Sequence, residues 1–189
     1  MSPVTHLLTG WVFANCERLD RRDRALVTLA CVAPDIDGLG IVPELLTRNS
    51  HHPLLWFSGY HHSLHSLAFA LVIAAVSVTL AHQRWKTGLL AFVSFHLHLV
   101  EDIAGSRGPD GDQWPIPYLK PFSSAWNLSW HGQWPLNAWP NVAITVALLI
   151  TTLWLAWLRG FSLLEMISEK GDAMFVAALR QRFPRHRQV

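Results

Sequence analysis

Eighteen residues that contain no Asp, Glu, Lys or Arg indicate the fold class: LHSLAFALVIAAVSVTLA, residues 64–81. A second stretch of the same length, residues 141–158, reads NVAITVALLITTLWLAWL and also lacks these four residue types. A helix needs ~20 mainly apolar residues to cross the hydrocarbon core of a bilayer. Both stretches are therefore predicted to be membrane-spanning helices.

The composition agrees with a membrane setting. Apolar residues make up 51% of the 189 residues and charged residues only 15%, whereas about a quarter of an average soluble domain is charged. The net charge of +2 is too small, and its Lys and Arg too scattered, to favour nucleic-acid binding. Cys16 and Cys31 lie in apolar stretches outside any Cys-x-x-Cys motif and are predicted to be free thiols.

The remaining helices are shorter and are predicted to form antiparallel pairs. Residues 88–100 are apolar except for His96 and His98, and the polar residues 83–88 join this run to the first span. The first forty residues form another pair, with helices over about 6–18 and 25–33 and a charged turn over 19–24. Pro34 ends the second helix of that pair. The chain is therefore predicted to be an all-α, membrane-embedded helical bundle.

Histidine and aspartate recur at metal-ligand spacing in three separated segments of this apolar chain. The segments contain Asp35 and Asp37, then His61 and His65, then His98 and Asp102. Residues four apart share one face of a helix, so His98 and Asp102 can bind one ion. Stranding such groups in an apolar interior costs several kcal/mol unless they pair or bind a cation. A metal site is therefore the first hypothesis.

The predicted order of helices brings these residues to one end of the bundle. His6 begins the first helix, and the second returns Asp35 and Asp37 to the same end. His65 begins the third helix, and the fourth helix brings back His98 and Asp102. The arginine-rich turn, the turn at residues 83–88 and Arg159 gather at the opposite end. The positive-inside rule then predicts that the basic end is cytoplasmic and that the metal site is on the outer face.

Three features outside the predicted ligand set also have a structural interpretation. His96 lies about 200° around a helix from His98, so it is expected to make helix contacts instead of binding the metal. Residues 105–140 form a long Trp- and Pro-rich connection on the site's side, and loops of this length are more often functional than idle. Residues 160–189 are predicted to be a basic amphipathic tail, distinct from a membrane bundle over residues 1–159, with the positive charge concentrated after Arg180.

At these positions the chain resembles the YdjM type of membrane-bound metal-dependent hydrolases. The matching motifs are Thr5-His6-Leu7-Leu8, Pro34-Asp35-Ile36-Asp37, His65-Ser66 and His98 to Asp102, followed by a Pro-rich segment at 117–122. The resemblance implies an inner-membrane helical protein with a zinc-dependent, phospholipase C-like site. Its implied metal-binding set is His6, Asp35, Asp37, His65, His98 and Asp102. The family's His-Arg pair falls on Tyr60-His61, so either His61 or His62 takes the first histidine's place through a one-residue shift, or this chain lacks that histidine.

The leading hypothesis is an integral membrane hydrolase that acts on a phosphoester or ester, with membrane lipid as the natural substrate class. Mixed imidazole and carboxylate ligands favour zinc, with manganese as the second candidate. Metal-bound hydroxide would attack the ester, with Asp37 as the first choice for general base and Glu101 as the second. The alternative is a non-catalytic membrane protein with a structural metal site or a polar His/Asp cluster. A transporter is disfavoured because the ionisable groups gather at helix ends instead of at mid-bilayer.

Overall fold

The computed structural model describes residues 1–108 and 111–184, and most of them are helical. Two candidate spans, α6 (Arg84–Gly105) and α7 (Trp139–Arg159), are the longest helices in this part of the chain. The others are α1 (Pro3–Ala14), α2 (Arg21–Ala30), α3 (Ile41–Thr47), α4 (Trp56–Tyr60), α5 (Leu67–Leu80) and α8 (Glu169–Arg182), with 3₁₀ helices η1 (Ala33–Gly40) and η2 (Leu163–Met166). The all-α fold is confirmed.

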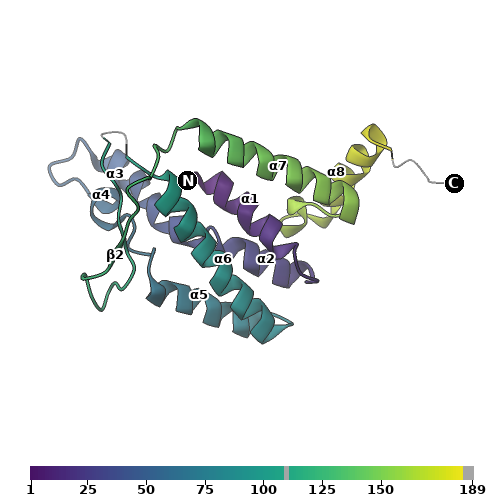
Figure 1. The fold of residues 1–189 in the computed structure, drawn as a ribbon, viewed down its shortest axis with the longest axis horizontal. Coiled ribbons are helices and arrows are strands. Elements are labelled where there is room, and N and C mark those ends of the chain that lie inside the picture. Colours follow the sequence, from purple (N-terminus) through teal and green to yellow (C-terminus); the bar gives the residue numbers. More distant parts are fainter. Residues whose placement is uncertain (109–110, 185–189) are drawn as a thin grey trace.

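The five longer helices before the tail lie roughly along one axis, as Figure 1 shows. Helix α5 packs on α6, α2 packs on α6, and α1 packs between α2 and α7. The contact between α1 and α2 is close because Gly10 has no side chain: an added Cβ would lie 2.6 Å from the carbonyl oxygen of Thr28. This close approach holds α1, which carries His6, against the helix that leads to Asp35.

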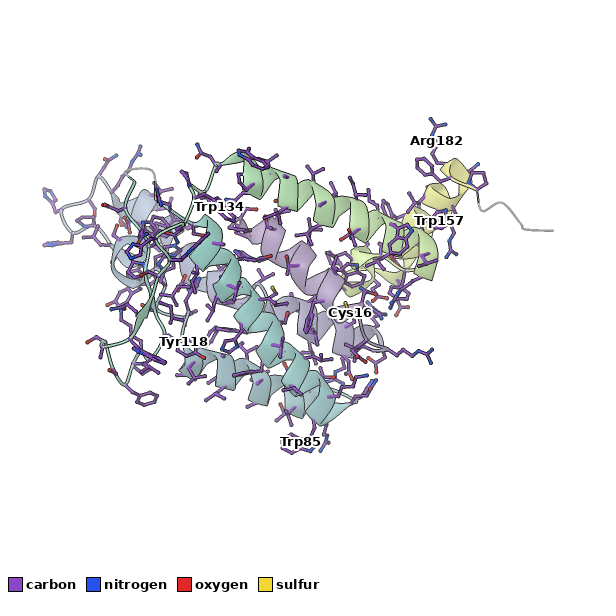
Figure 2. All side chains as sticks on the ribbon, viewed as in Figure 1. Cys16, Trp85, Tyr118, Trp134, Trp157 and Arg182 are labelled. Atoms are coloured by element: carbon purple, nitrogen blue, oxygen red, sulfur yellow. The ribbon has the colours of Figure 1, made fainter. Side chains whose placement is uncertain are left out.

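The up-and-down order places the chain segments as predicted. The N-terminus, η1, α3, α4 and the long connection lie at one end of the bundle, and the turns after α1, α5 and α7 lie at the other. In Figure 2, Tyr118 and Trp134 mark the first end, called here the site pole, while Cys16 and Trp85 lie toward the opposite, basic pole. Cys16 and Cys31 are both free thiols, as expected.

The apolar run 64–81 forms a shorter helix than predicted. Helix α5 has 14 residues because the side chain of Ser66 caps its N-terminus and His65 belongs to the preceding turn. Helix α6 is longer than its apolar run and has 22 residues. It continues through Glu101 and Asp102 because these carboxylates face other helices within the bundle instead of lipid.

The second predicted helix, over residues 25–33, corresponds to α2, which ends at Ala30, before Pro34. Helix α2 is followed by η1 and then α3. The segments Arg21–Ala30 and Ala33–Thr47 are together long and apolar enough to cross a membrane, with a bend of 53° at the break between them. Pro34 occupies the first turn of η1, where its missing N–H is no loss. The bend therefore puts a 3₁₀ helix, with its two aspartates, at the site pole.

The long connection folds back onto the site pole. Its strands β1 (Ile116–Pro117) and β2 (Asn127–Leu128) pair antiparallel, and Ile116 is buried against Phe95 and Leu99 of α6. At the basic pole, buried Arg24 pairs with Glu165 of η2, with 2.6 Å between Arg24 Nε and Glu165 Oε1. The division into a bundle over 1–159 and a tail over 160–189 stays a prediction, and the tail's Arg185 and Arg187 lie outside the described residues.

Candidate metal centre

Four of the predicted ligands come together at the site pole: His6 from α1, Asp35 from η1, and His98 and Asp102 from α6. Each offers one ligand atom, and these atoms all lie within 4.8 Å of one another. The spacing of four residues on α6 brings His98 Nε2 to 3.0 Å from Asp102 Oδ2. His6 and His98 are fully buried. The sequence motifs of three segments thus converge on one point.

Neighbouring acceptors fix the orientation of both imidazole rings. His98 Nδ1 lies 2.7 Å from the carbonyl oxygen of Cys31 and donates to it. His6 Nδ1 lies 2.6 Å from Glu101 Oε2, and the Thr9 hydroxyl donates to the other oxygen of the same carboxylate. With Nδ1 protonated in a neutral ring, Nε2 carries the lone pair, and in both rings that atom faces the cluster. An acceptor on Nδ1 is the usual support of a metal-binding histidine.

The 3₁₀ geometry of η1 directs its two aspartates toward different neighbours. With three residues per turn, Asp35 and Asp37 point about 240° apart. Asp35 Oδ1 lies 3.8 Å from His98 Nε2, within the cluster. Asp37 instead accepts from the backbone N–H of Leu64 at 3.0 Å and lies 3.2 Å from His61 Nδ1. Asp37 therefore contacts the histidine turn and lies outside the four-residue group.

His65 joins the cluster from the turn before α5. Its Nε2 lies 3.0 Å from His98 Nε2 and 3.4 Å from Asp102 Oδ2, and its Nδ1 lies 3.4 Å from Asp37 Oδ2. Burial lowers the pKa of His65, but the carboxylates of Asp102 and Asp37 outweigh this and raise the pKa to about 9. The surrounding carboxylates thus favour a positive charge at this position.

The turn that carries His61 and His62 has an unusual backbone. His62 has a φ of 70°, a left-handed conformation that is uncommon for a residue other than glycine. The ring of His61 lies 4.1 Å from that of His62, measured between centroids, and both rings contact Trp114 edge-on. Burial is the main reason that the pKa of His62 falls to about 3, with His61 and His65 adding to the effect. Such backbone strain is typical of functional sites.

The ligand atoms at the centre of the cluster fit a divalent cation. Two buried atoms there, His6 Nε2 and Asp35 Oδ2, have no hydrogen-bond partner, and buried polar atoms are rarely left without one. His6 Nε2 lies 3.2 Å from Asp102 Oδ1, an oxygen that the Met1 ammonium group and the Ser106 hydroxyl also contact. Two imidazole nitrogens and two carboxylate oxygens are a common ligand set for zinc. The residues therefore fit a metal.

A cavity of about 370 Å³ leads to the cluster. Its polar side chains are those of Asp35, His61, His62, Asp102 and Ser106. Met1, whose ammonium group contacts Asp102 Oδ1, also lines it, and the rest is mainly apolar. The apolar lining comes from the N-terminus, η1, α4 and the long connection, and includes Leu39, Phe57, Trp114 and Leu136. The cluster is thus accessible from outside on one side, instead of being enclosed by protein.

Two further observations complete the site. His96 faces away, as predicted: its Nε2 lies 2.8 Å from the hydroxyl of Tyr118 and its Nδ1 lies 2.7 Å from the carbonyl oxygen of Phe92. Sequence reasoning considered Glu101 only as a second choice of base, but the structure places it behind His6. A carboxylate on an apolar helix, next to a predicted ligand, was the available signal for a supporting role.

A second group of His and Asp residues, Asp20, Asp23 and His82, lies at the basic pole. Asp23 accepts from the backbone N–H groups of His82 and Gln83 and from the Thr87 hydroxyl. Asp20 caps α2 and lies 2.6 Å from His82 Nδ1. These hydrogen bonds explain the group as a structural connection between α2 and the turn before α6.

The comparisons with known proteins agree with this architecture. A search of curated proteins and a search of solved structures each found no match. The family model described as YdjM inner membrane protein matches residues 1–176, which include every residue of the cluster and nearly all of the described helices. The chain therefore belongs to the YdjM inner membrane protein family.

Proposed function

We propose that the protein is an integral membrane, metal-dependent hydrolase that cleaves a phosphoester or ester of a membrane lipid. The observation that carries this proposal is the cavity lined by Asp35 and Asp102, two of the four residues of the cluster. A structural metal site is enclosed by protein, whereas a catalytic site keeps a position open to solvent or substrate, as the cavity beside Asp35 and Asp102 would allow. The access through the cavity favours the catalytic alternative.

Within this proposal, His6, Asp35, His98 and Asp102 hold a divalent cation, with zinc favoured over manganese. The cation supplies Lewis acidity toward the ester and activates water for attack. Glu101 and the carbonyl oxygen of Cys31 keep Nε2 of His6 and His98 unprotonated and aimed at the cation. His65 lies beside Asp102 and adds a further nitrogen to the cluster.

Asp37 is proposed as a positioning residue. One of its oxygens lies 3.2 Å from His61 Nδ1, and the other accepts from the N–H of Leu64 and faces His65. These contacts favour a role in orienting the histidine turn over a role as general base. The catalytic assignment made from the sequence stays a prediction that the Asp37→Asn variant tests, as described below.

Membrane lipid is favoured as the substrate because the cavity opens at a pole that carries exposed apolar residues. Leu39, which lines the cavity, is 65% exposed. Leu46 of α3, Trp56 of α4 and Trp126 of the long connection, which also lie at the site pole, are 81%, 52% and 60% exposed. Large exposed apolar patches mark membrane or partner surfaces, and tryptophan is enriched at the headgroup level. The basic residues at the other pole, taken with the positive-inside rule, support the proposal that this pole lies at the outer face of the inner membrane.

The proposal is tested with purified protein in vesicles of phosphatidylethanolamine and phosphatidylglycerol. Release of the headgroup, with or without its phosphate, and release of fatty acid are measured after chelation and again after addition of zinc or manganese. We expect activity to disappear with the chelator and to return with the metal. A protein that retains its metal but cleaves no lipid, phosphoester or carboxylic ester in a broad panel would instead support a structural metal site.

A further inference from the structure

A second hollow lies on the flank of the bundle, between α2, η1 and α5. This groove has a volume of about 340 Å³. It is lined by Leu26, Leu29, Ala30, Val32, Ala33, Ile36, Ile73, Val76 and Ser77. The Ser77 hydroxyl donates to the carbonyl oxygen of Ile73 at 2.8 Å, so the one polar side chain in the lining is already satisfied. The groove therefore offers nothing to a polar headgroup and suits a hydrocarbon chain.

The groove faces lipid. Leu29, on its α2 wall, is 51% exposed, and Val76, on its α5 wall, is 44% exposed. Both helices belong to the apolar bundle of an inner membrane protein. In a bilayer, acyl chains are the medium that fills an apolar hollow on this flank. The surroundings thus define the chemistry of the occupant.

The far end of the groove lies about one leaflet away from the site pole. Helix α5 begins at Leu67 beside the site, and Ser77, the deepest groove residue on this helix, is ten residues further along. At 1.5 Å per residue, that distance is ~15 Å. Half of a ~30 Å hydrocarbon core is also ~15 Å. An acyl chain that extends from a headgroup at the site pole would therefore fit the groove along its length.

The 3₁₀ helix connects the groove to the site cavity. With three residues per turn, Ala33, Ile36 and Leu39 form one row along η1. Ala33 and Ile36 line the groove, while Leu39 lines the cavity that holds the cluster. Ile36 and Leu39 are 55% and 65% exposed, although both are large and apolar. The row is thus an apolar path from the lipid-facing groove to the cavity.

We propose that the groove between α2 and α5 is an acyl-chain subsite of the candidate hydrolase. The hydrocarbon chain of a membrane lipid lies in the groove and along the row of Ile36 and Leu39, while its headgroup ester reaches the cluster beside Asp35. This inference rests on the proposed function for its catalytic meaning. The binding of the chain can be tested without catalysis.

The first experiment measures where a lipid chain binds. Metal-free, full-length protein in vesicles of phosphatidylethanolamine and phosphatidylglycerol is irradiated with a trace phospholipid that carries a diazirine in the middle of its acyl chain. We expect labelling of residues 26–36 and 73–77 to exceed that of the exposed face of α7 several-fold. The Val76→Trp variant, which fills the groove, should reduce that labelling, whereas Leu71→Trp should not. Leu71 is 54% exposed on the same helix and does not line the groove.

The second experiment measures how hydrolysis by the metal-loaded protein depends on acyl-chain length. Val76→Trp should lower kcat/KM for a long-chain phospholipid about tenfold or more, because the loss of even one methylene contact in an apolar pocket lowers kcat/KM by about that factor. Its kcat/KM for a short-chain analogue with the same headgroup should stay within about twofold of the wild type. Equal labelling of α5 and α7, or an equal loss on both substrates, would overturn the subsite. Absence of hydrolysis by the wild type would overturn the proposed function. The labelling result alone would then show whether the groove binds an acyl chain.

Discussion

The hydrogen bond from His6 to Glu101 predicts how far substitution of Glu101 should lower the affinity for metal. Glu101 Oε2 lies 2.6 Å from His6 Nδ1, and the glutamate side chain is only 14% exposed. Charge-assisted hydrogen bonds of this length are strong, and solvent screens them weakly at a half-buried position. Loss of such a supporting partner lowers metal affinity by about 10–100-fold, or about 1.4–2.7 kcal/mol. We expect about tenfold for Glu101→Gln, which can still accept a hydrogen bond, and about 100-fold for Glu101→Leu.

The assay is competition for zinc between the metal-free protein and a chromophoric chelator, in detergent. Glu17→Gln is the matched control, because Glu17 pairs with Lys86 on the exposed surface of the basic pole. A double-mutant cycle then isolates the route of the effect. In a His6→Ala background, Glu101→Gln should change zinc affinity by less than about twofold, because Glu101 acts through His6.

Two results would refute this reasoning. The first is a zinc affinity of Glu101→Leu equal to that of the wild type, which would mean that His6 needs no support or binds no metal. The second is a full effect of Glu101→Gln in the absence of His6, which would mean that the carboxylate acts directly. Thermal unfolding in the presence of chelator separates both results from a general loss of structure.

Three further predictions concern other parts of the molecule. Asp37→Asn should lower zinc affinity and turnover together, because Asp37 orients His65; lower turnover with full zinc binding would restore its assignment as general base. Arg24→Ala should destabilise the protein by about 3–5 kcal/mol in detergent unfolding, because it leaves the Glu165 charge buried and unpaired, and a loss below about 1 kcal/mol would contradict this. A cysteine at exposed Asp112 should react with an impermeant reagent added outside intact cells, whereas reaction only after lysis would reverse the orientation.

The architecture could be predicted from the sequence where local chemistry decides it. Apolar runs without charged residues indicated the helices, and the basic turns indicated where they end. Because the helices run alternately up and down between these turns, His6, Asp35, His98 and Asp102 were expected at one pole. The periodicity of a helix was also sufficient to separate His96 from His98. These conclusions needed only residue type, order and helical spacing.

Other features depend on contacts that the sequence does not display. The length of α6 depends on whether Glu101 faces lipid or another helix, and only the packing of α1 on α6 answers this. The separation of Asp35 from Asp37 depends on a 3₁₀ helix, which Pro34 permits but does not require. The closeness of His65 to His98 is likewise a tertiary contact between a turn and a helix.

The central claim is that His98 belongs to a metal site, and metal content tests it most directly. His98 and His96 are two residues apart on α6, but only His98 faces the cluster. Elemental analysis of detergent-purified protein should find zinc or manganese in the wild type and in His96→Ala, and a clear loss in His98→Ala. Equal metal content in all three proteins, or no metal after reconstitution of the wild type, would contradict the account.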